Sequence, residues 1–333
     1  MLKVAINGFG RIGRQAAKVL LENRNVLIVA INDLTEPEML AYLLKHDSVY
    51  GESNLNIKSS DKALVVGSKK IPVFAEKDPL SLPWKSLEVD VVIESTGRFT
   101  DREKASSHLV AGSKKVVISA PAKDPDATLV LGVNHKEYNP DKHHIISNGS
   151  CTTNCLAPIA KVMNDKFGVK RSFMNTVHAF TNSQNILDLP AKERRAARAA
   201  TINIIPHTSG ATKSVVEAIP ELKGKMDGLA LRVPVADVSI LDYVVQLKKK
   251  VEMKNLLAAF EKAAAKEMKG ILKINYQPLV SSDFIGDPHS AIVDAPLTMI
   301  MDGDLVRVMA WYDNEWGYSN RLAEMTIWVG NGV

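Results

Sequence analysis

Apolar and polar positions alternate along the first 150 residues in a way that predicts strands separated by helices. Leu2–Ile6, which is apolar except for Lys3, and the continuously apolar Val26–Ile31 are short runs typical of buried strands. Between them, Arg11–Glu22 carries apolar residues at helical spacing on one face. The chain therefore opens with a strand, a helix and a second strand.

The same alternation continues further along the chain. Val89–Ile93 is another buried strand, and a capping box at Thr100–Glu103 predicts a helix that ends at Gly112. Val116–Ile118 and Thr128–Val133 continue the series of strands. Parallel strands need crossover helices on both faces of their sheet. We therefore expect a Rossmann-type, doubly wound α/β domain over residues 1–149.

A different pattern begins at residue 150. Val238–Leu247 and Leu305–Trp311 alternate apolar and polar residues, as antiparallel strands with one solvated face do. Lys254–Met268 has a helical apolar stripe. This predicts a catalytic α+β domain with a mostly antiparallel sheet over residues 150–314, followed by a C-terminal helix, 315–333, that packs back on the first domain.

Composition narrows the class of protein. The chain has 333 residues, of which 46% are hydrophobic and 24% charged, as in ordinary globular proteins and unlike disordered or collagenous chains. A formal net charge of +5 fits anionic small molecules as well as nucleic acid. No apolar run approaches a membrane span, and polar residues interrupt positions 1–15 where a signal peptide would have its core. We expect a cytoplasmic protein without a membrane partner.

A glycine-rich turn joins the first strand to the first helix. Gly8, Gly10 and Gly13 form the G-x-G-x-x-G pattern of dinucleotide-binding domains, in which the backbone approaches a pyrophosphate at a helix N-terminus. Asp33 follows the last glycine by 33 − 13 = 20 positions, where a carboxylate can accept hydrogen bonds from ribose hydroxyls and repel a 2′-phosphate. The alternative is a simple tight turn, with Asp33 capping the segment after Thr35. The combined pattern favours NAD as cofactor.

The two cysteines are four residues apart, a spacing that suits neither a disulfide framework nor a zinc site. Ser150 is placed as a helix N-cap and Cys151 as the first helical residue, where the helix dipole favours the thiolate and lowers its pKa. Cys155 lies one helical turn after Cys151, where we expect a small buried hydrophobic residue rather than a nucleophile. Among the eight histidines, His178 ends a strand before a polar turn and is the candidate base.

Metal binding is not expected. His143 and His144 are neighbours on a predicted strand, so their side chains point to opposite faces and cannot join Cys151 in one site.

Several segments, spread over nearly the whole chain, resemble those of one enzyme family. The chain is similar to glyceraldehyde-3-phosphate dehydrogenases of the phosphorylating, NAD-linked kind. The matching segments are Asn7–Arg14 (NGFGRIGR), Glu94–Gly97 (ESTG), Ser119–Pro121 (SAP), Ser150–Pro158 (SCTTNCLAP), Leu187–Pro190 (LDLP), Leu229–Pro234 (LALRVP) and Trp311–Asn320 (WYDNEWGYSN).

The resemblance implies a mechanism of covalent catalysis. Cys151 attacks the aldehyde, His178 takes the proton, and hydride passes to the nicotinamide. Inorganic phosphate then attacks the resulting thioester and releases 1,3-bisphosphoglycerate, in glycolysis or gluconeogenesis. The family also assembles as homotetramers.

The resemblance also assigns binding residues by position. The substrate phosphate is held by Thr181, Arg232 and, with a less clean alignment, Arg195. The attacking phosphate is held by Ser150, Thr152, Ser209 and Gly210. The cofactor is held by the glycine turn with Arg11, Ile12, Asp33, Lys77, Thr96, Ser119, Asn314 and Tyr318.

The chain departs from the family in a few places, and two other functions stay open. Ser209 stands where Thr is usual, and Ser183 replaces a common Asp near the substrate pocket. An erythrose-4-phosphate dehydrogenase would share Cys151 and His178. A non-enzymatic protein that binds dinucleotide or RNA is the remaining alternative, but the chain lacks the basic stripe and aromatic platform typical of RNA binding.

Overall fold

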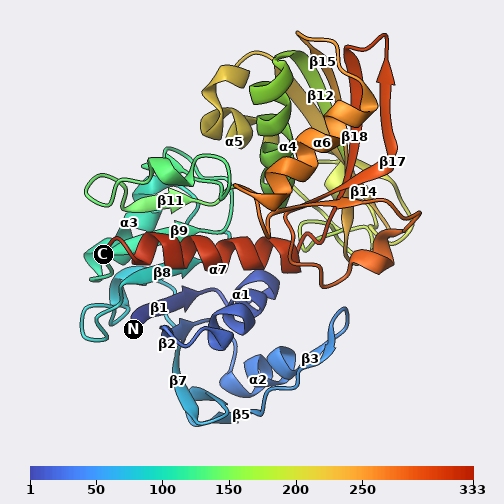
Figure 1. The fold of residues 1–333 in the computed structure, drawn as a ribbon. Helices are drawn as coiled ribbons and strands as arrows, with labels where there is room; N and C mark the ends of the chain where they lie inside the picture. Colours follow the sequence, from blue (N-terminus) through green and yellow to red (C-terminus); the bar gives the residue numbers. More distant parts are fainter. The chain divides into compact units, whose positions relative to one another are not determined.

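The structure, a computed structural model, describes residues 1–333, and the chain groups into two compact units. The first unit contains Met1–Leu129, Lys136–Gly149 and Ser319–Val333, and the second contains Val130–His135 and Ser150–Tyr318. This division differs from the predicted one at residues 130–135 and 315–318, which group with the second unit. Figure 1 shows both units and the terminal helix in red.

A nine-stranded sheet forms the centre of the first unit, in the order β10-β11-β9-β8-β1-β2-β7-β6-β5. The strands from β10 to β7 are parallel, and β6 and β5 add an antiparallel edge. The bounds are β1 (Leu2–Asn7), β2 (Val26–Asn32), β5 (Ile57–Ser60), β6 (Ala63–Val66), β7 (Lys69–Phe74), β8 (Val91–Glu94), β9 (Lys115–Ile118), β10 (Ala127–Thr128) and β11 (Ile145–Ser147). A separate hairpin pairs β3 (His46–Asp47) with β4 (Gly51–Glu52).

The first β-α-β unit forms as its sequence predicts. α1 spans Arg11–Glu22, and its face with Ala16, Ala17 and Leu20 is buried. β1 lies between β2 and β8, so the chain first builds outward from β1 and then returns to its other side. Such a reversal opens a crevice at the carboxyl ends of the strands, where ligands bind in doubly wound folds.

Two local predictions for this unit are wrong. The predicted strand Thr128–Val133 is reduced to β10, because the chain turns at Gly132 with φ +78°. The predicted capping box at Thr100 does not open α3 (Arg102–Val110). Asp101 is the N-cap instead, and its side chain accepts a hydrogen bond from the Lys104 N–H, since a carboxylate caps as well as a hydroxyl.

The second unit has a seven-stranded sheet in the order β13-β14-β12-β15-β18-β17-β16. Four of its six pairings are antiparallel, which confirms the mostly antiparallel sheet. The bounds are β12 (Val169–Ala179), β13 (Ile205–Thr208), β14 (Met226–Val233), β15 (Ser239–Leu247), β16 (Leu272–Asn275), β17 (Ala291–Met301) and β18 (Leu305–Tyr312).

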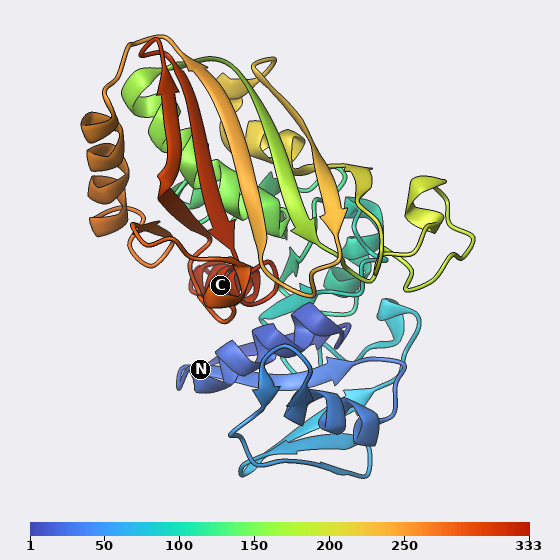
Figure 2. The same cartoon turned by 90° about the vertical axis from the view of Figure 1, so that its right-hand side faces the viewer.

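Helices cover one face of this sheet (Figure 2). α4 (Cys151–Phe167) runs across β12, β15, β17 and β18, while α6 (Met253–Ala265) contacts β16 and β17. The other helices are α2 (Pro37–Lys45), α5 (Ala211–Ala218) and α7 (Trp316–Gly330). No helix has both the length and the apolar composition needed to cross a bilayer.

Candidate active site

Steric crowding explains why two positions of the glycine turn in the first unit must be glycine. Gly8 has φ +91°, and an added Cβ there would lie 2.6 Å from the Thr96 nitrogen. At Gly13 a Cβ would lie 2.2 Å from the Gly8 carbonyl oxygen. At Gly10 it would meet nothing within 4 Å. Gly8 and Gly13 therefore serve the turn and the helix packing, while Gly10 leaves open space for a ligand that approaches the backbone.

The N-terminus of α1 has no side-chain cap. Its N-cap is Gly10, which offers no side-chain cap, and the first turn contains no acidic residue. Asp33 accepts the Phe9 N–H at 2.7 Å through one carboxylate oxygen and the Thr35 N–H at 3.0 Å through the other. The carboxylate thus fixes the turn and keeps further lone pairs for ribose hydroxyls. A helix N-terminus without a side-chain cap, next to such a carboxylate, fits NAD.

The two arginines of this helix have protein partners. Arg11 donates to Asp47 at 2.7 Å, and Arg14 donates to the Phe9 carbonyl at 3.0 Å. Burial raises the pKa of Asp47, but hydrogen bonds from Val49 N–H and Arg11 outweigh it and hold the pKa below its usual value. The guanidinium of Arg11 is therefore drawn toward Asp47.

The other predicted cofactor residues of the first unit follow parallel strands. Thr96 comes after β8 and donates through its N–H and hydroxyl to Glu94. Ser119 comes after β9 and donates its N–H to the Glu94 carbonyl at 2.9 Å. Lys77 is exposed beyond β7 and makes no hydrogen bond or ion pair. Ile12 lies in the first turn of α1.

Asn314 and Tyr318 belong to the second unit. The Asn314 side-chain oxygen accepts a 2.7 Å hydrogen bond from the Ser239 hydroxyl, which in turn accepts the Ala179 N–H at 3.1 Å. Asn314 is thereby tied to the end of β12. Tyr318 is buried.

Cys151 and His178 lie together in the second unit. Ser150 is the N-cap of α4 and forms a capping box with Thr153, so Cys151 is the first helical residue, as predicted. His178 is the penultimate residue of β12 and is 2% exposed. The Cys151 Sγ and His178 Nε2 atoms are 3.3 Å apart. This distance is within the range for transfer of the thiol proton to imidazole.

The expected lowering of the Cys151 pKa is wrong for this structure. Burial raises the pKa of the thiol, and the opposing charge of Arg232 and hydrogen bonds from Thr152 do not cancel it. The position at the helix start is as predicted, but desolvation outweighs it. Burial likewise raises the pKa of Cys155, which is fully enclosed. The structure therefore pairs a neutral thiol with a neutral base.

Arg232 on β14 controls the other side of the imidazole. Its guanidinium lies 2.6 Å from His178 Nδ1 and 3.2 Å from the Ala179 carbonyl, and Nδ1 is 2.7 Å from that same carbonyl. Burial and the nearby arginine lower the pKa of His178 to about 3. An Nδ1–H directed at the carbonyl leaves Nε2 as an acceptor, whereas donation from Arg232 requires a bare Nδ1. The two arrangements are alternatives.

The remaining residues predicted to bind phosphate lie on several elements, and not all of them are near Cys151. Thr152 is held by the Tyr312 hydroxyl at 2.9 Å, and Thr181 hydrogen-bonds Ser183 at 2.8 Å. Ser209 and Gly210 lie at the N-terminus of α5, which contacts α4. Arg195 is exposed in a short 3-10 helix, where its carbonyl accepts the Arg198 N–H, and its side chain makes no contact with the Cys151–His178 pair.

Sequence reasoning missed Tyr312 and Ser239. The Tyr312 hydroxyl bridges Thr152 and Thr176, and its ring meets His178 edge-on with centroids 5.9 Å apart. Tyr312 ends β18 inside the WYDNEWGYSN segment, so the motif contained it, but no local pattern shows which strand it faces. Ser239 begins β15 and carries no motif.

Comparisons with known proteins agree along the whole chain. Residues 2–102 match the family described as "Glyceraldehyde 3-phosphate dehydrogenase, NAD binding domain", and residues 150–314 match "Glyceraldehyde 3-phosphate dehydrogenase, C-terminal domain". The chain is 53% identical over 329 residues to glyceraldehyde-3-phosphate dehydrogenase 1 of Bacillus cereus, covering 99% of this chain and 98% of that one. It is 52% identical over 330 residues to glyceraldehyde-3-phosphate dehydrogenase of Geobacillus stearothermophilus, with the same coverage.

A further relative, glyceraldehyde-3-phosphate dehydrogenase 1 of Bacillus subtilis, is 52% identical over 328 residues, which cover 98% of both chains. The glycine turn, Asp33 and the Cys151–His178 pair thus lie in a chain with both domains of one family. The chain belongs to the glyceraldehyde 3-phosphate dehydrogenase family and is an NAD-dependent oxidoreductase that acts on an aldehyde.

Proposed function

We propose that this enzyme oxidises and phosphorylates D-glyceraldehyde 3-phosphate to 1,3-bisphosphoglycerate through a thioester on Cys151, as a step of glycolysis or gluconeogenesis. The observation that carries the proposal is the 3.3 Å contact between Cys151 Sγ and His178 Nε2 at the start of a capped helix. NAD, when bound, supplies the hydride acceptor that the oxidation requires.

His178 acts first as the base. Its Nε2 accepts the thiol proton as Sγ bonds to the aldehyde carbon, which relieves the desolvation that disfavours a free thiolate. The Ala179 carbonyl, 2.7 Å from Nδ1, orients the ring for this transfer. The imidazolium then stabilises the oxyanion on the attacked carbon.

Arg232 is the ligand we assign to the substrate phosphate. It is largely buried, and its Nε atom has no hydrogen-bond partner, so the guanidinium retains a donor for an anion. An anionic phosphate competes for the N–H that now points at His178 Nδ1. Its binding frees Nδ1 to carry a proton toward Ala179 and leaves Nε2 as the acceptor. Thr181, braced by Gln184 and Ser183, supplies a hydroxyl to the same phosphate.

The second anion pocket surrounds the start of α4. We assign the attacking inorganic phosphate to the hydroxyls of Ser150, Thr152 and Ser209 and to the backbone of Gly210, near the positive end of the helix dipole. Attack on the thioester carbon breaks the C–S bond and returns the thiolate of Cys151, which regains a proton from His178.

The direct test is NADH formation from glyceraldehyde 3-phosphate and NAD, in buffers with and without inorganic phosphate. We expect sustained turnover only with phosphate. Faster turnover of erythrose 4-phosphate would overturn the substrate assignment, and sustained turnover without phosphate would overturn the acceptor. Absence of turnover on both sugars would contradict the proposed activity. The Bacillus relatives provide the positive control.

We also propose that the enzyme is a homotetramer. Large apolar side chains are exposed in the loop that follows β12 and on the strands of the second unit. They include Ile186, Leu187, Ile202, Ile204, Phe173, Leu229, Met299 and Met301. Monomers seldom expose so many large apolar side chains within one domain, whereas homo-oligomer interfaces are rich in them. Light scattering of the purified chain tests this, since a mass of one subunit contradicts the assembly.

A further inference from the structure

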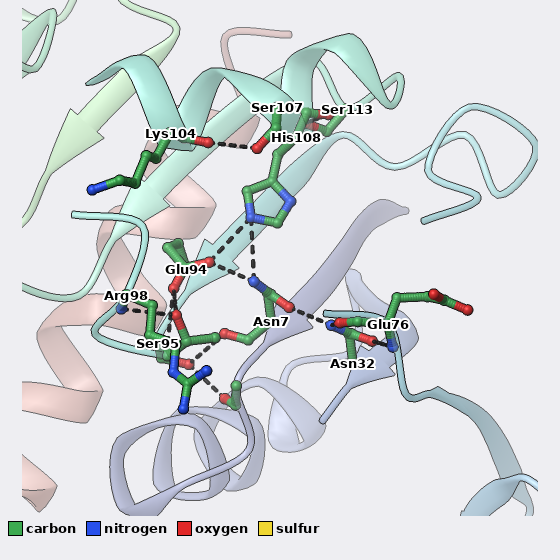
Figure 3. Close-up of polar contacts among 12 residues, drawn as sticks. Asn7, Asn32, Glu76, Glu94, Ser95, Arg98, Lys104, Ser107, His108 and Ser113 are labelled. Carbon is green, nitrogen blue, oxygen red and sulfur yellow. Dashed lines mark hydrogen bonds and ion pairs between the residues drawn. The ribbon is translucent and has the colours of Figure 1, made fainter. Parts of the chain in front are cut away.

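A hydrogen-bonded chain of buried polar side chains lies at the carboxyl ends of β1, β2 and β8 (Figure 3). It is centred on Glu94, the last residue of β8, which lies opposite Asn7 in the register of β1. Glu94 and Asn7 are each 1% exposed and His108 is fully buried. Buried polar groups this close together need a consistent pattern of donors and acceptors.

The first end of the chain is set by a backbone donor. The Glu76 N–H donates to Asn32 Oδ1 at 2.8 Å, which fixes the orientation of the Asn32 amide. Asn32 Nδ2 then donates to Asn7 Oδ1 at 2.7 Å, so Asn7 must turn its own Nδ2 toward Glu94 Oε2, 2.6 Å away. Glu94 is an acceptor at this contact.

The second end is set by an indole. Trp84 Nε1–H can only donate, and it lies 3.0 Å from His108 Nδ1. His108 therefore carries its proton on Nε2 and donates it to Glu94 Oε2 at 3.1 Å. The 3.3 Å approach of Asn7 Nδ2 to His108 Nε2 is then a contact between two donors that converge on one oxygen.

Glu94 consequently receives only donors. Thr96 gives its backbone N–H at 2.8 Å and its hydroxyl to Oε1, while Asn7 and His108 share Oε2. No hydrogen-bond acceptor lies opposite either oxygen. The carboxyl group is held by the hydrogen-bond donors of Thr96, Asn7 and His108.

The Glu94 side chain fixes the backbone of the turn that follows β8. Thr96 Oγ1, which donates to Glu94, also accepts the Arg98 N–H at 3.0 Å, so the turn after β8 is built on Glu94. Ser95 Oγ donates to the Gly8 carbonyl at 2.6 Å, and the Thr96 backbone occupies the space where a Gly8 side chain would lie. The glycine turn is therefore braced by a segment that Glu94 holds.

We propose that Glu94 is a positioning residue for the cofactor, which sets Thr96 and the glycine turn through a one-directional chain of hydrogen bonds from Glu76 and Trp84. The inference rests on the placement of NAD at this edge of the sheet. It assigns Asn7, His108 and Trp84 a shared role, which is to hold the Glu94 side chain in place as a hydrogen-bond acceptor.

The first variant is Glu94→Gln, which keeps the shape but brings an NH2 group. That NH2 must face either the donors of Asn7 and His108 or the Thr96 N–H, and each choice leaves donors opposed. We expect the Kd for NAD, measured by calorimetry, to rise about ten-fold, with KM for NAD rising by a similar factor and kcat changing less.

The decisive variant moves the carboxylate across the strand pair. In Asn7→Asp/Glu94→Gln, the new aspartate accepts from Asn32, from the glutamine NH2 and from His108 Nε2–H, while the glutamine oxygen keeps the Thr96 N–H. Every donor regains an acceptor. We expect the double variant to bind NAD within about three-fold of the original chain, and Asn7→Asp alone, which opposes two carboxylates, to bind more weakly than either.

Each outcome decides the matter. If Glu94→Gln lowers the melting temperature but leaves the Kd for NAD unchanged, Glu94 serves stability alone and the proposal fails. If the double variant folds yet binds NAD as weakly as Glu94→Gln, the directional chain is wrong. Should Glu94→Gln fail to fold, the double variant still tests the proposal, since it must both fold and bind.

Two control variants separate this inference from the placement of NAD. Asp126→Asn alters another carboxylate of the first unit, which accepts the His144 and Ile145 N–H groups, and should lower stability without changing the Kd for NAD. Asp33→Asn should weaken NAD binding. If Asp33→Asn has no effect on NAD binding, the cofactor placement is at fault rather than the role of Glu94.

Discussion

The candidate functional residues of the two units are built from different material. In the first unit the cofactor edge is made of backbone: glycines that exclude Cβ atoms, a helix start without a side-chain cap, and carboxylates that hold N–H groups in place. In the second unit the reacting groups are side chains brought together from α4, β12 and β14. Adding a side chain at a glycine should therefore impair the first unit, whereas removing a reacting side-chain atom should impair the second.

The largest effect is expected at the nucleophile. Cys151→Ser keeps the helix start and the contact with His178 but replaces a thiol with a much weaker nucleophile, so kcat should fall by at least about a thousand-fold. NADH formation measures the loss. Calorimetry should show unchanged NAD binding, and a serine variant that retains substantial activity would refute covalent catalysis by Cys151.

The glycine turn gives a paired prediction for the first unit. Gly13→Ala places a Cβ 2.2 Å from the Gly8 carbonyl and should both destabilise the unit, by about 1–3 kcal/mol, and abolish tight NAD binding. Gly10→Ala meets open space and should leave the unfolding free energy nearly unchanged while still weakening NAD binding. Urea unfolding and calorimetry separate the two, and equal stability losses would contradict the distinction.

His178 connects the second unit to pH. Its folded-state pKa of about 3 lies below the usual 6.5, so the unfolded chain takes up a proton first as pH falls. The stability contributed by neutral His178 is complete above pH 6.5 and declines by about 1.4 kcal/mol per pH unit toward pH 3. His178→Asn should flatten this part of the curve of unfolding free energy against pH. A curve parallel to that of the original chain would contradict the shift.

The smallest effect is expected at Tyr312. Tyr312→Phe removes the hydroxyl that bridges Thr152 and Thr176 but keeps the ring against His178. The unfolding free energy should drop by about 1–2 kcal/mol. KM for inorganic phosphate should rise a few-fold while KM for NAD stays constant. A change confined to NAD would show that Tyr312 does not act through Thr152.

The same contrast explains what the sequence could predict. The glycine turn, α1 and the N-capped Cys151 follow from short-range rules, because spacing and backbone conformation determine them locally. The shortened strand at 128 and the Asp101 cap were missed because a turn or a competing cap decides them within one or two residues. The Cys151 pKa was misjudged because burial depends on the surrounding fold.

Long-range polar contacts were beyond sequence reasoning. Arg232 and His178 are adjacent only because β14 pairs in parallel with β12, a register that no local pattern reveals. The Glu94 chain joins residues separated by up to 101 positions, and its members Trp84 and His108 belong to none of the recognised motifs. Such groups are identified by their partners, which only the folded chain supplies.

The discontinuous first unit affects how the chain folds during synthesis. Its central strand β1 is synthesised long before Ser319–Val333, yet both belong to this unit, and Gly330 packs against Leu2. The second unit contains no residue beyond Tyr318. Domains ordinarily fold in the order of synthesis. Here the unit that begins first is completed after the second unit, so a chain that stops at Tyr318 lacks part of its cofactor-binding unit.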